Sequence, residues 1–354
     1  MTAQPPSRAA RQRRQPVTMK DVAAAAGVAQ STVSRILNDA PVQINVSEET
    51  RERVRTIARD LGYRPHPLAR ALRGAPTMLL GVVVRDITDP FFAGGIEALS
   101  TEAHARGYSV VLGHAHAKAD EALALTTVLE ARQCDAIVLM GDFQDQRRLL
   151  ADLRSANVPV VALWHGSERP FPFPIVGVDN RAGTRAALDH LTGLGHERIA
   201  FVGRESLGDI RERREAYRRY LIERSRAPLK GYVRRVPNTL AGAAQGLDAL
   251  LRLPAPPTAI FAATDALAFG LLHAAWERGV SIPDDLSIIG FDDIPLAAGT
   301  VPGLTTIRMP IAAIAAAGVA LAIGPEAANG GGSYEARRIV LEPSLTVRSS
   351  TAAI

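Results

Sequence analysis

From residue 79 onward, short apolar segments alternate with longer amphipathic ones, and this alternation constrains the fold of the 354-residue chain more than any other feature. The apolar segments have the length of buried strands, and most are followed by a stretch with helical spacing. Such an alternation builds parallel sheets covered by helices on both faces, and its two successive runs predict two lobes. The predicted strands are 79–84, 109–112, 136–139, 158–163, 175–178, 198–202, 259–262 and 286–289.

Residues 22–35, near the start of the chain, have the pattern of a helix-turn-helix. An Ala-rich helical segment ends at Gly27, because glycine adopts left-handed backbone angles at little cost. A second short helix with small polar side chains follows, and in this motif the second helix enters the major groove of DNA. Gln30, Ser31 and Arg35 fall where they can bond base edges. An ordinary helical hairpin is the alternative interpretation.

Capping signals place two more helix starts around this motif. Thr18 and Asp21 have the spacing of a capping box at the start of the first helix. Ser47 and two glutamates open a third helix, which runs to Leu61 and is stopped by Gly62. Residues 1–15 are rich in Pro, Gln, Ser and Arg and are expected to be a disordered tail. The helical DNA-binding domain is therefore predicted at 16–62.

A short segment rich in proline separates this domain from the alternating pattern. The prolines at 65 and 67 exclude regular helix, but Pro67 can start a new one. Residues 68–73 then have the composition of a helix of two turns, which is unstable by itself in water. Such a helix orders only against a partner, so residues 63–77 are predicted to be a hinge.

Positive charge is concentrated at the N-terminal end of the chain. Residues 1–75 contain 13 Lys and Arg against 6 Asp and Glu, whereas the remainder contains 28 and 30. The positive field therefore coincides with the helix-turn-helix, as expected for a polyanionic partner. Four arginines in the first 15 residues leave a basic tail as the alternative source of the excess.

Several classes of protein are disfavoured by what the sequence lacks. Cys134 is the single cysteine, which excludes an internal disulfide, fits a reducing cytosol and favours a buried structural thiol. No secretion signal is visible, and the longest apolar run, 311–323, is too short to span a bilayer. No phosphate-binding loop, zinc motif or nucleophile elbow is present, so we expect no enzyme, cofactor or metal. His114 and His116 alternate at strand spacing, which favours a strand end over metal binding.

Taken in order, these features resemble the lactose/purine repressor family of bacterial transcription regulators, over about residues 17–349. The markers that carry the resemblance are 18–37, 47–63, 68–72, 89–92, 178–180, 194–196, 289–293 and 304–306. The resemblance implies an all-α helix-turn-helix DNA-binding domain plus an α/β two-lobed periplasmic-binding-protein-like core at 78–350. The first lobe is expected at about 78–177 and 308–335, and the second at about 178–307 and 336–350. It also implies a homodimer, without a tetramerising coiled coil, on a pseudo-palindromic operator.

The resemblance assigns DNA contacts to two segments. Gln30 and Ser31 read bases, and Arg35 makes a further base or backbone contact. In the hinge, Leu72 matches a leucine that wedges into the minor groove, although packing on its dimer mate is the alternative. Ala29 stands where the family usually has a serine cap. The full set of implied DNA-binding residues is Thr18, Gln30, Ser31, Thr32, Ser34, Arg35, Leu68, Ala69 and Leu72, with Thr32 and Ser34 as phosphate contacts.

The resemblance also places an effector in the cleft between the lobes. Phe91 and Phe92 match cleft-lining aromatics, with core packing as the alternative. Arg213 matches an effector-binding arginine of the family and shares a helical stripe with apolar residues, where an arginine requires a buried anion or a hydroxyl-rich ligand. A solvated basic face is the alternative for the run 211–219. Asp292 matches an acidic contact whose carboxylate accepts bonds from adjacent hydroxyls. For its neighbour Asp293, a structural role is the better interpretation.

Three departures from the family pattern bear on the effector. Trp164, Thr264 and Met309 stand where aspartate, asparagine and glutamine are often found. Together they predict a less polar pocket and an effector that is not a plain hexose, but a larger or partly apolar sugar, polyol or related metabolite that stacks on Trp164. A secreted sugar receptor lacks support because there is no signal peptide. A regulator without an effector remains the alternative. The expected location is the cytoplasm, on the bacterial nucleoid, without a membrane partner.

Overall fold

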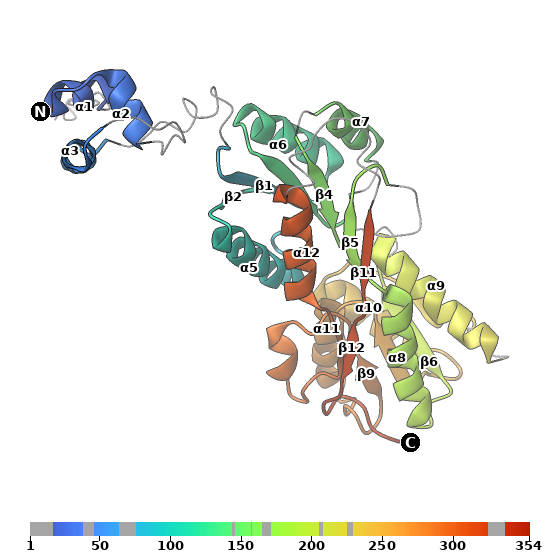
Figure 1. The fold of residues 1–354 in the computed structure, drawn as a ribbon. Coiled ribbons are helices and arrows are strands. Elements are labelled where there is room, and N and C mark those ends of the chain that lie inside the picture. Colours follow the sequence, from blue (N-terminus) through green and yellow to red (C-terminus); the bar gives the residue numbers. More distant parts are fainter. Residues whose placement is uncertain are drawn as a thin grey trace, which may run out of the picture. The chain divides into compact units, whose positions relative to one another are not determined.

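The computed structural model describes residues 17–37, 46–63, 76–143, 146–156, 158–164, 171–204, 208–224, 229–324 and 337–354. These residues belong to two compact units, Met1–Thr77 and Met78–Ile354 (Figure 1). The predicted tail at 1–15 and the predicted hinge contacts Leu68, Ala69 and Leu72 lie outside the described residues. No helix in the described ranges is both long and apolar enough to cross a membrane.

The N-terminal unit contains the predicted helix-turn-helix. Its helices are α1 (Met19–Ala26), α2 (Gln30–Leu37) and α3 (Glu48–Asp60). The predicted capping box at Thr18 is present, and Gly27 ends α1 in the left-handed conformation with φ 66°. Ser47 caps α3 as predicted. The helices pack around one small apolar core, formed by Val22, Ala23, Ala26, Val33, Ile36, Val54 and Ala58.

The second unit begins with a six-stranded parallel sheet in the order β11-β5-β4-β3-β1-β2. Its strands are β1 (Leu79–Val84), β2 (Ser109–His114), β3 (Ala136–Met140), β4 (Val160–Leu163), β5 (Ile175–Val178) and β11 (Arg338–Leu341). Its helices are α5 (Pro90–Ala105), α6 (Ala119–Ala131), α7 (Arg147–Ser155) and α12 (Ile311–Ile323). The first five strands were predicted, with ends that differ by at most two residues. The apolar run at 311–323 forms α12, which buries Ile314 and Val319 in the core.

Helices cover both faces of this sheet, because side chains alternate along each strand. Leu80, Val82 and Val84 of β1 pack in the same core as α5 and α12. Val83, in contrast, belongs to a core shared with α6 and α7. Figure 1 shows α5 and α12 side by side on their face of the sheet.

The second lobe contains a four-stranded parallel sheet in the order β7-β6-β8-β9, next to the antiparallel pair β10-β12. Its strands are β6 (Ile199–Gly203), β7 (Val233–Arg235), β8 (Ala259–Ala262), β9 (Ser287–Ile289), β10 (Thr306–Arg308) and β12 (Ser344–Thr346). Its helices are α8 (Asn180–Gly193), α9 (Gly208–Glu223), α10 (Leu240–Leu251), α11 (Asp265–Glu277) and a short 3₁₀ helix, Pro295–Ala298. Helices α8 and α9 share the core of α5 and α12, so a continuous apolar interior joins the lobes.

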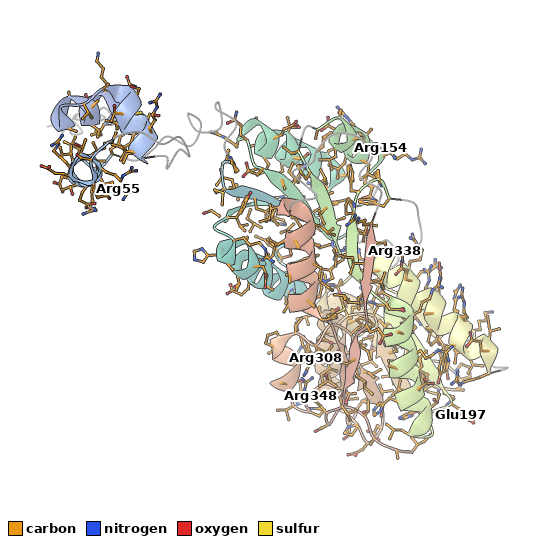
Figure 2. All side chains as sticks on the ribbon, viewed as in Figure 1. Arg55, Arg154, Glu197, Arg308, Arg338 and Arg348 are labelled. Atoms are coloured by element: carbon orange, nitrogen blue, oxygen red, sulfur yellow. The ribbon has the colours of Figure 1, made fainter. Side chains whose placement is uncertain are left out.

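The chain passes between the lobes after β5, after β10 and after β11. One predicted boundary is wrong, because 336–350 was assigned as a whole to the second lobe. Residues 338–341 form β11, which pairs in parallel with β5 at the edge of the first sheet. Only the segment that follows, including β12, pairs within the second lobe. The carboxylate of Asp293 binds Arg308 and Arg348 there, as the structural interpretation of this acid predicted. Figure 2 labels the two arginines.

Candidate functional site

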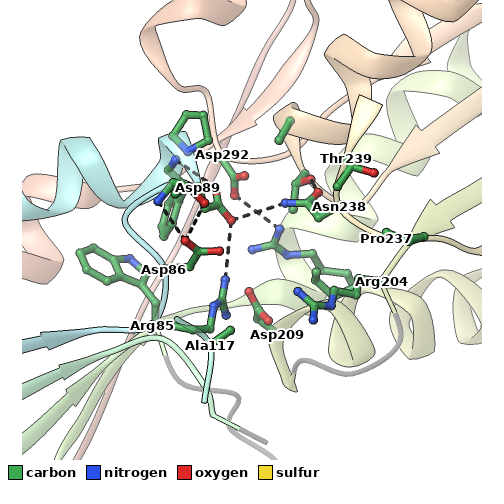
Figure 3. A pocket seen from close by; sticks show the side chains of 18 of the residues that line it. Arg85, Asp86, Asp89, Ala117, Arg204, Asp209, Pro237, Asn238, Thr239 and Asp292 are labelled. Atoms are coloured by element: carbon green, nitrogen blue, oxygen red, sulfur yellow. Dashed lines mark hydrogen bonds and ion pairs between the residues drawn. The ribbon is translucent and has the colours of Figure 1, made fainter. Parts of the chain in front are cut away.

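A cavity of about 680 Å³ lies where the two lobes meet. Its walls come from the carboxyl ends of strands in both sheets, as expected for an open α/β fold. Figure 3 shows Asp86 and Asp89 of the first lobe facing Asn238 and Asp292 of the second. The charged lining residues are Arg85, Asp86, Asp89, Arg204, Asp209, Arg213, Arg235 and Asp292. Arginines and aspartates are therefore equal in number around the space.

Arg213 makes several hydrogen bonds in the wall of the cavity. It lies on α9 and is 2% exposed, as its place in an apolar stripe predicted. Its Nε donates to Asn180 Oδ1 at 2.8 Å, and its Nη1 donates to the carbonyl of Ala263 at 2.6 Å. The guanidinium carbon lies 3.6 Å from the centre of the Phe291 ring. These contacts leave Nη2 without a partner among the described residues, so it can serve a ligand.

Asp292 forms a buried ion pair with Arg213, at 3.4 Å between Oδ1 and Nη1. Burial raises the pKa of Asp292 well above its ordinary value, and the guanidinium of Arg213 only partly opposes this shift. The residue has φ 126°, a conformation rare for side chains other than glycine. Its N–H donates to Ile307 and its carbonyl accepts from Met309, which fixes the strained backbone. The sequence thus predicted two residues that the structure brings together.

A second ion pair lies on the opposite wall and was not predicted. Arg85 Nη2 lies 3.7 Å from Asp89 Oδ2, and the Asp89 carboxylate also caps α5 by accepting the N–H of Phe91. Burial raises the pKa of Asp89, although Arg85 opposes the shift. Asn238, from the second lobe, points its amide at Asp89 Oδ2 over 3.5 Å. The only sequence signal was the Asp-Pro pair, which is typical of any capped helix start.

Of the three predicted aromatic residues, two line the cavity and one packs in the core behind it. Phe91 and Trp164 line the cavity, with ring centroids 5.4 Å apart in an edge-to-face arrangement. Phe92 is not among the lining residues and is 1% exposed, so core packing is its role here. Its ring lies 4.9 Å from the guanidinium carbon of Arg85 and so supports that side chain.

Two of the departures from the family pattern also line the cavity. Met309 is an apolar part of the wall. Thr264 caps α11 and donates from Oγ1 to Asn238 Oδ1 at 2.9 Å. Two polar atoms of the lining residues are buried without a hydrogen-bond partner among the described residues, namely Trp164 Nε1 and Asp209 Oδ1. A donor and an acceptor left open in one cavity indicate where a ligand can bond.

Helix α2 presents the predicted DNA-reading side chains. Val33 and Ile36 of this helix are buried, whereas Gln30, Ser31 and Arg35 are exposed on the other side. Thr32 and Ser34 are half-buried, and Thr18 is exposed at the cap of α1. Among the described residues, no group of three or more His, Cys, Asp or Glu side chains is placed so that it could hold a metal ion, and this includes the neighbourhood of His114 and His116.

Comparison with known proteins agrees with both parts of this architecture. Residues 18–66 match the model of the lacI family of bacterial regulatory proteins, and residues 188–351 match a periplasmic binding protein-like domain. The chain is 33% identical to the HTH-type transcriptional regulator GalS of Salmonella typhimurium, over 87% of this chain and 89% of GalS.

Solved structures give the same result. The Lac repressor dimer bound to operator and the anti-inducer ONPF superposes with a TM-score of 0.85 at 27% identity, covering 96% of this chain and 100% of that one. A complex of the transcriptional regulator CelR with cellobiose superposes with a TM-score of 0.70 at 27% identity, covering 94% and 99%. The chain therefore belongs to the LacI family of bacterial DNA-binding transcriptional regulators.

Proposed function

We propose that this regulator binds a pseudo-palindromic operator as a homodimer and releases or retains it according to a small-molecule effector in the interlobe cavity. The observation that carries the proposal is the cavity itself, in which Arg213 and Asp292 meet while keeping hydrogen-bonding capacity for a ligand. An effector that binds one closure state of the lobes better than the other shifts the equilibrium between them. The Lac repressor complex, a dimer on operator with an anti-inducer, provides the precedent.

Selection of bound sequences from random duplexes, at about 0.15 M salt to suppress non-specific binding, tests the DNA part of this proposal. We expect an enriched palindrome of roughly 14–20 base pairs, because two-fold protein symmetry requires two half-sites. If no motif is enriched even when metabolite pools are added, the proposal of sequence-specific DNA reading fails.

Arg35→Ala is expected to relax base preference at one position of each half-site. A guanidinium that bonds guanine O6 and N7 contributes roughly 1–3 kcal/mol of discrimination. Arg35 is exposed on α2, so its guanidinium is available for such a contact. The measurement is the affinity of the variant for the selected operator, for single-base variants of it and for random DNA. Thr32→Ala is the matched control, since loss of a phosphate contact weakens all sequences alike. An equal loss on operator and random DNA for Arg35→Ala would argue against base reading.

We further propose that Trp164 contacts the effector through its Nε1–H group and not through its ring face. The ring is 5% exposed and is packed edge-on against Phe91, so little of its face is available for stacking. A Cβ atom added to Gly95 would lie 2.6 Å from the far edge of the indole, so that edge is covered too. Nε1, in contrast, is a buried donor without a partner among the described residues.

Trp164→Phe is therefore expected to weaken effector binding by roughly tenfold, because it removes one hydrogen bond to a buried donor while keeping an aromatic ring. Calorimetry against a panel of neutral sugars, glycosides and nucleosides provides the measurement. Trp276→Phe is the matched control, because Trp276 is 77% exposed and is not among the residues that line the cavity. Unchanged affinity in Trp164→Phe would rule out the indole N–H as a ligand contact.

A further inference from the structure

A row of four ionisable side chains runs to the cavity from the surface of the first lobe. The imidazole rings of His114 and His116 lie 3.9 Å apart between centroids, with their planes tilted by 34°. His114 Nε2 is 3.4 Å from Asp86 Oδ1, and Asp86 lines the cavity. At the other end of the row, His116 Nδ1 bonds the carboxylate of Glu121. The order is therefore acid, imidazole, imidazole, acid.

The backbone ties this row to the cavity wall. After β2 the chain turns through His116 and Ala117, which have φ 48° and 58°. Two successive residues in the left-handed region, neither of them glycine, store strain that their surroundings must hold. The N–H of Ala115 donates to the backbone carbonyl of Val84 at 3.0 Å, and the N–H of Ala117 donates to the backbone carbonyl of Arg85 at 2.7 Å. Ala117 itself lines the cavity, so a change in this turn changes the wall.

Of the two carboxylate oxygens of Asp86, only Oδ1 has hydrogen-bond partners among the described residues. Its Oδ1 accepts the N–H of Thr88 at 3.0 Å and the hydroxyl of Thr88 at 2.6 Å. Partial burial opposes ionisation, but the bonds from Thr88 and the interaction with His114 outweigh it and lower the pKa of Asp86. The carboxylate is thus charged at neutral pH. Its Oδ2 has no partner among the described residues.

We propose that Asp86 contacts the effector through Oδ2, and that the His114–His116 pair positions Asp86 according to the protonation of the two rings. The effector contact rests on the function proposed above, whereas the link between the histidines and the wall stands on the geometry alone. Histidine changes charge in the physiological range of pH. A charged His114 draws Asp86 toward itself, where the carboxylate competes poorly for a ligand.

Other charged side chains lie near the His114–His116 pair. One carboxylate oxygen of Glu121 bonds His116, and the other accepts from Lys118 Nζ at 2.7 Å. Arg85, whose carbonyl holds the turn, is paired with Asp89. Two cations 3.9 Å apart repel, so a second proton on the pair separates the rings and displaces the turn. Acidification should therefore weaken effector binding.

Fluorine NMR of the full chain labelled with 5-fluorotryptophan tests the link without any effector. The chain has two tryptophans, and in Trp276→Phe the single signal reports on Trp164, in the cavity wall. Between about pH 8 and pH 5.5, the range in which histidine titrates, we expect this signal to shift. His114→Gln and His116→Gln should each lose most of the shift. His273→Gln, which removes a half-exposed histidine on α11, should retain it.

Three outcomes are informative. An equal shift in His114→Gln and His273→Gln, or no shift at all, overturns the link between the pair and the wall. Binding of cellobiose, used as a probe, then tests the contact: its dissociation constant should rise on acidification in the unsubstituted chain but not in His114→Gln. If the fluorine profile is as expected but cellobiose and the effector panel fail to bind at any pH, the proposed effector function fails and the link stands.

Discussion

Arg213→Met is expected to lower the free energy of unfolding of the two-lobed unit by about 3 to 5 kcal/mol and to abolish effector binding. The guanidinium is 2% exposed, and it bonds Asn180 and Ala263, stacks on Phe291 and pairs with Asp292. Removing it leaves the carboxyl of Asp292 buried without a cation. The cost arises mainly from that orphaned group, since a methionine replaces most of the lost volume.

Urea unfolding, followed by fluorescence at several pH values, measures this effect. Asp292 without its partner has an even stronger tendency to stay neutral in the folded state, so the variant should lose more stability at pH 8 than at pH 5. Asn in place of Asp292 removes the charge, and Arg213→Met/Asp292→Asn should recover part of the loss. If the double variant is as unstable as the sum of the single ones, the two side chains are not coupled, contrary to the structure.

Most of the strands that the sequence predicted are buried apolar runs, and the exception is β2, an edge strand with one buried residue. Parallel strands inside an α/β lobe are nearly continuous apolar runs, as in 79–84 and 259–262, so composition alone locates them. The four strands that were missed are short or lie at edges. Strand β7 has the sequence Val-Arg-Arg, and in β11 two of the four residues are exposed. Without burial there is no apolar pattern to recognise.

In the candidate site, too, the residues that could be predicted are those whose surroundings are set by their own helix. Residues that only the fold brings together could not be predicted. Arg213 could be predicted because its own helix gives it apolar neighbours at helical spacing. Asp89 and Asn238 could not, since each looks like an ordinary cap or loop residue until the fold brings them within 3.5 Å across the lobes. Trp164 was predicted to line the cavity, but the closeness of Gly95 and Phe91 to its ring could not be predicted, because it is a property of packing.

Asp265→Asn is expected to change the pH dependence of stability as strongly as any substitution outside the cavity. Asp265 is fully buried and accepts hydrogen bonds from the N–H of Ile294 at 3.0 Å and from the hydroxyl of Thr306 at 2.5 Å. Burial raises the pKa of Asp265 from 3.8 to about 7, against the effect of these bonds. The folded state therefore binds the proton more tightly than the unfolded state does.

The sign of the effect follows from this difference. Below about pH 4 the carboxyl is neutral in both states, and its contribution to stability is fully present. As the pH rises toward 7 the unfolded chain ionises first, so stability is lost by up to about 1.4 kcal/mol per pH unit, or about 4 kcal/mol in all. Asparagine keeps the shape, accepts from Ile294 and donates to Thr306, but it never ionises.

The free energy of unfolding of the Asp265→Asn variant, relative to the unsubstituted chain, should thus increase between about pH 4 and pH 7 and level off above that range. Comparing the two proteins at each pH cancels the titration of all other groups. Asp293→Asn is the contrasting variant, because Arg308 and Arg348 lower the pKa of Asp293 despite partial burial. Stability from that carboxylate is present above the ordinary pKa of aspartate and lost in acid, so its profile must have the opposite slope. Parallel profiles for the two variants would show that burial does not keep Asp265 neutral.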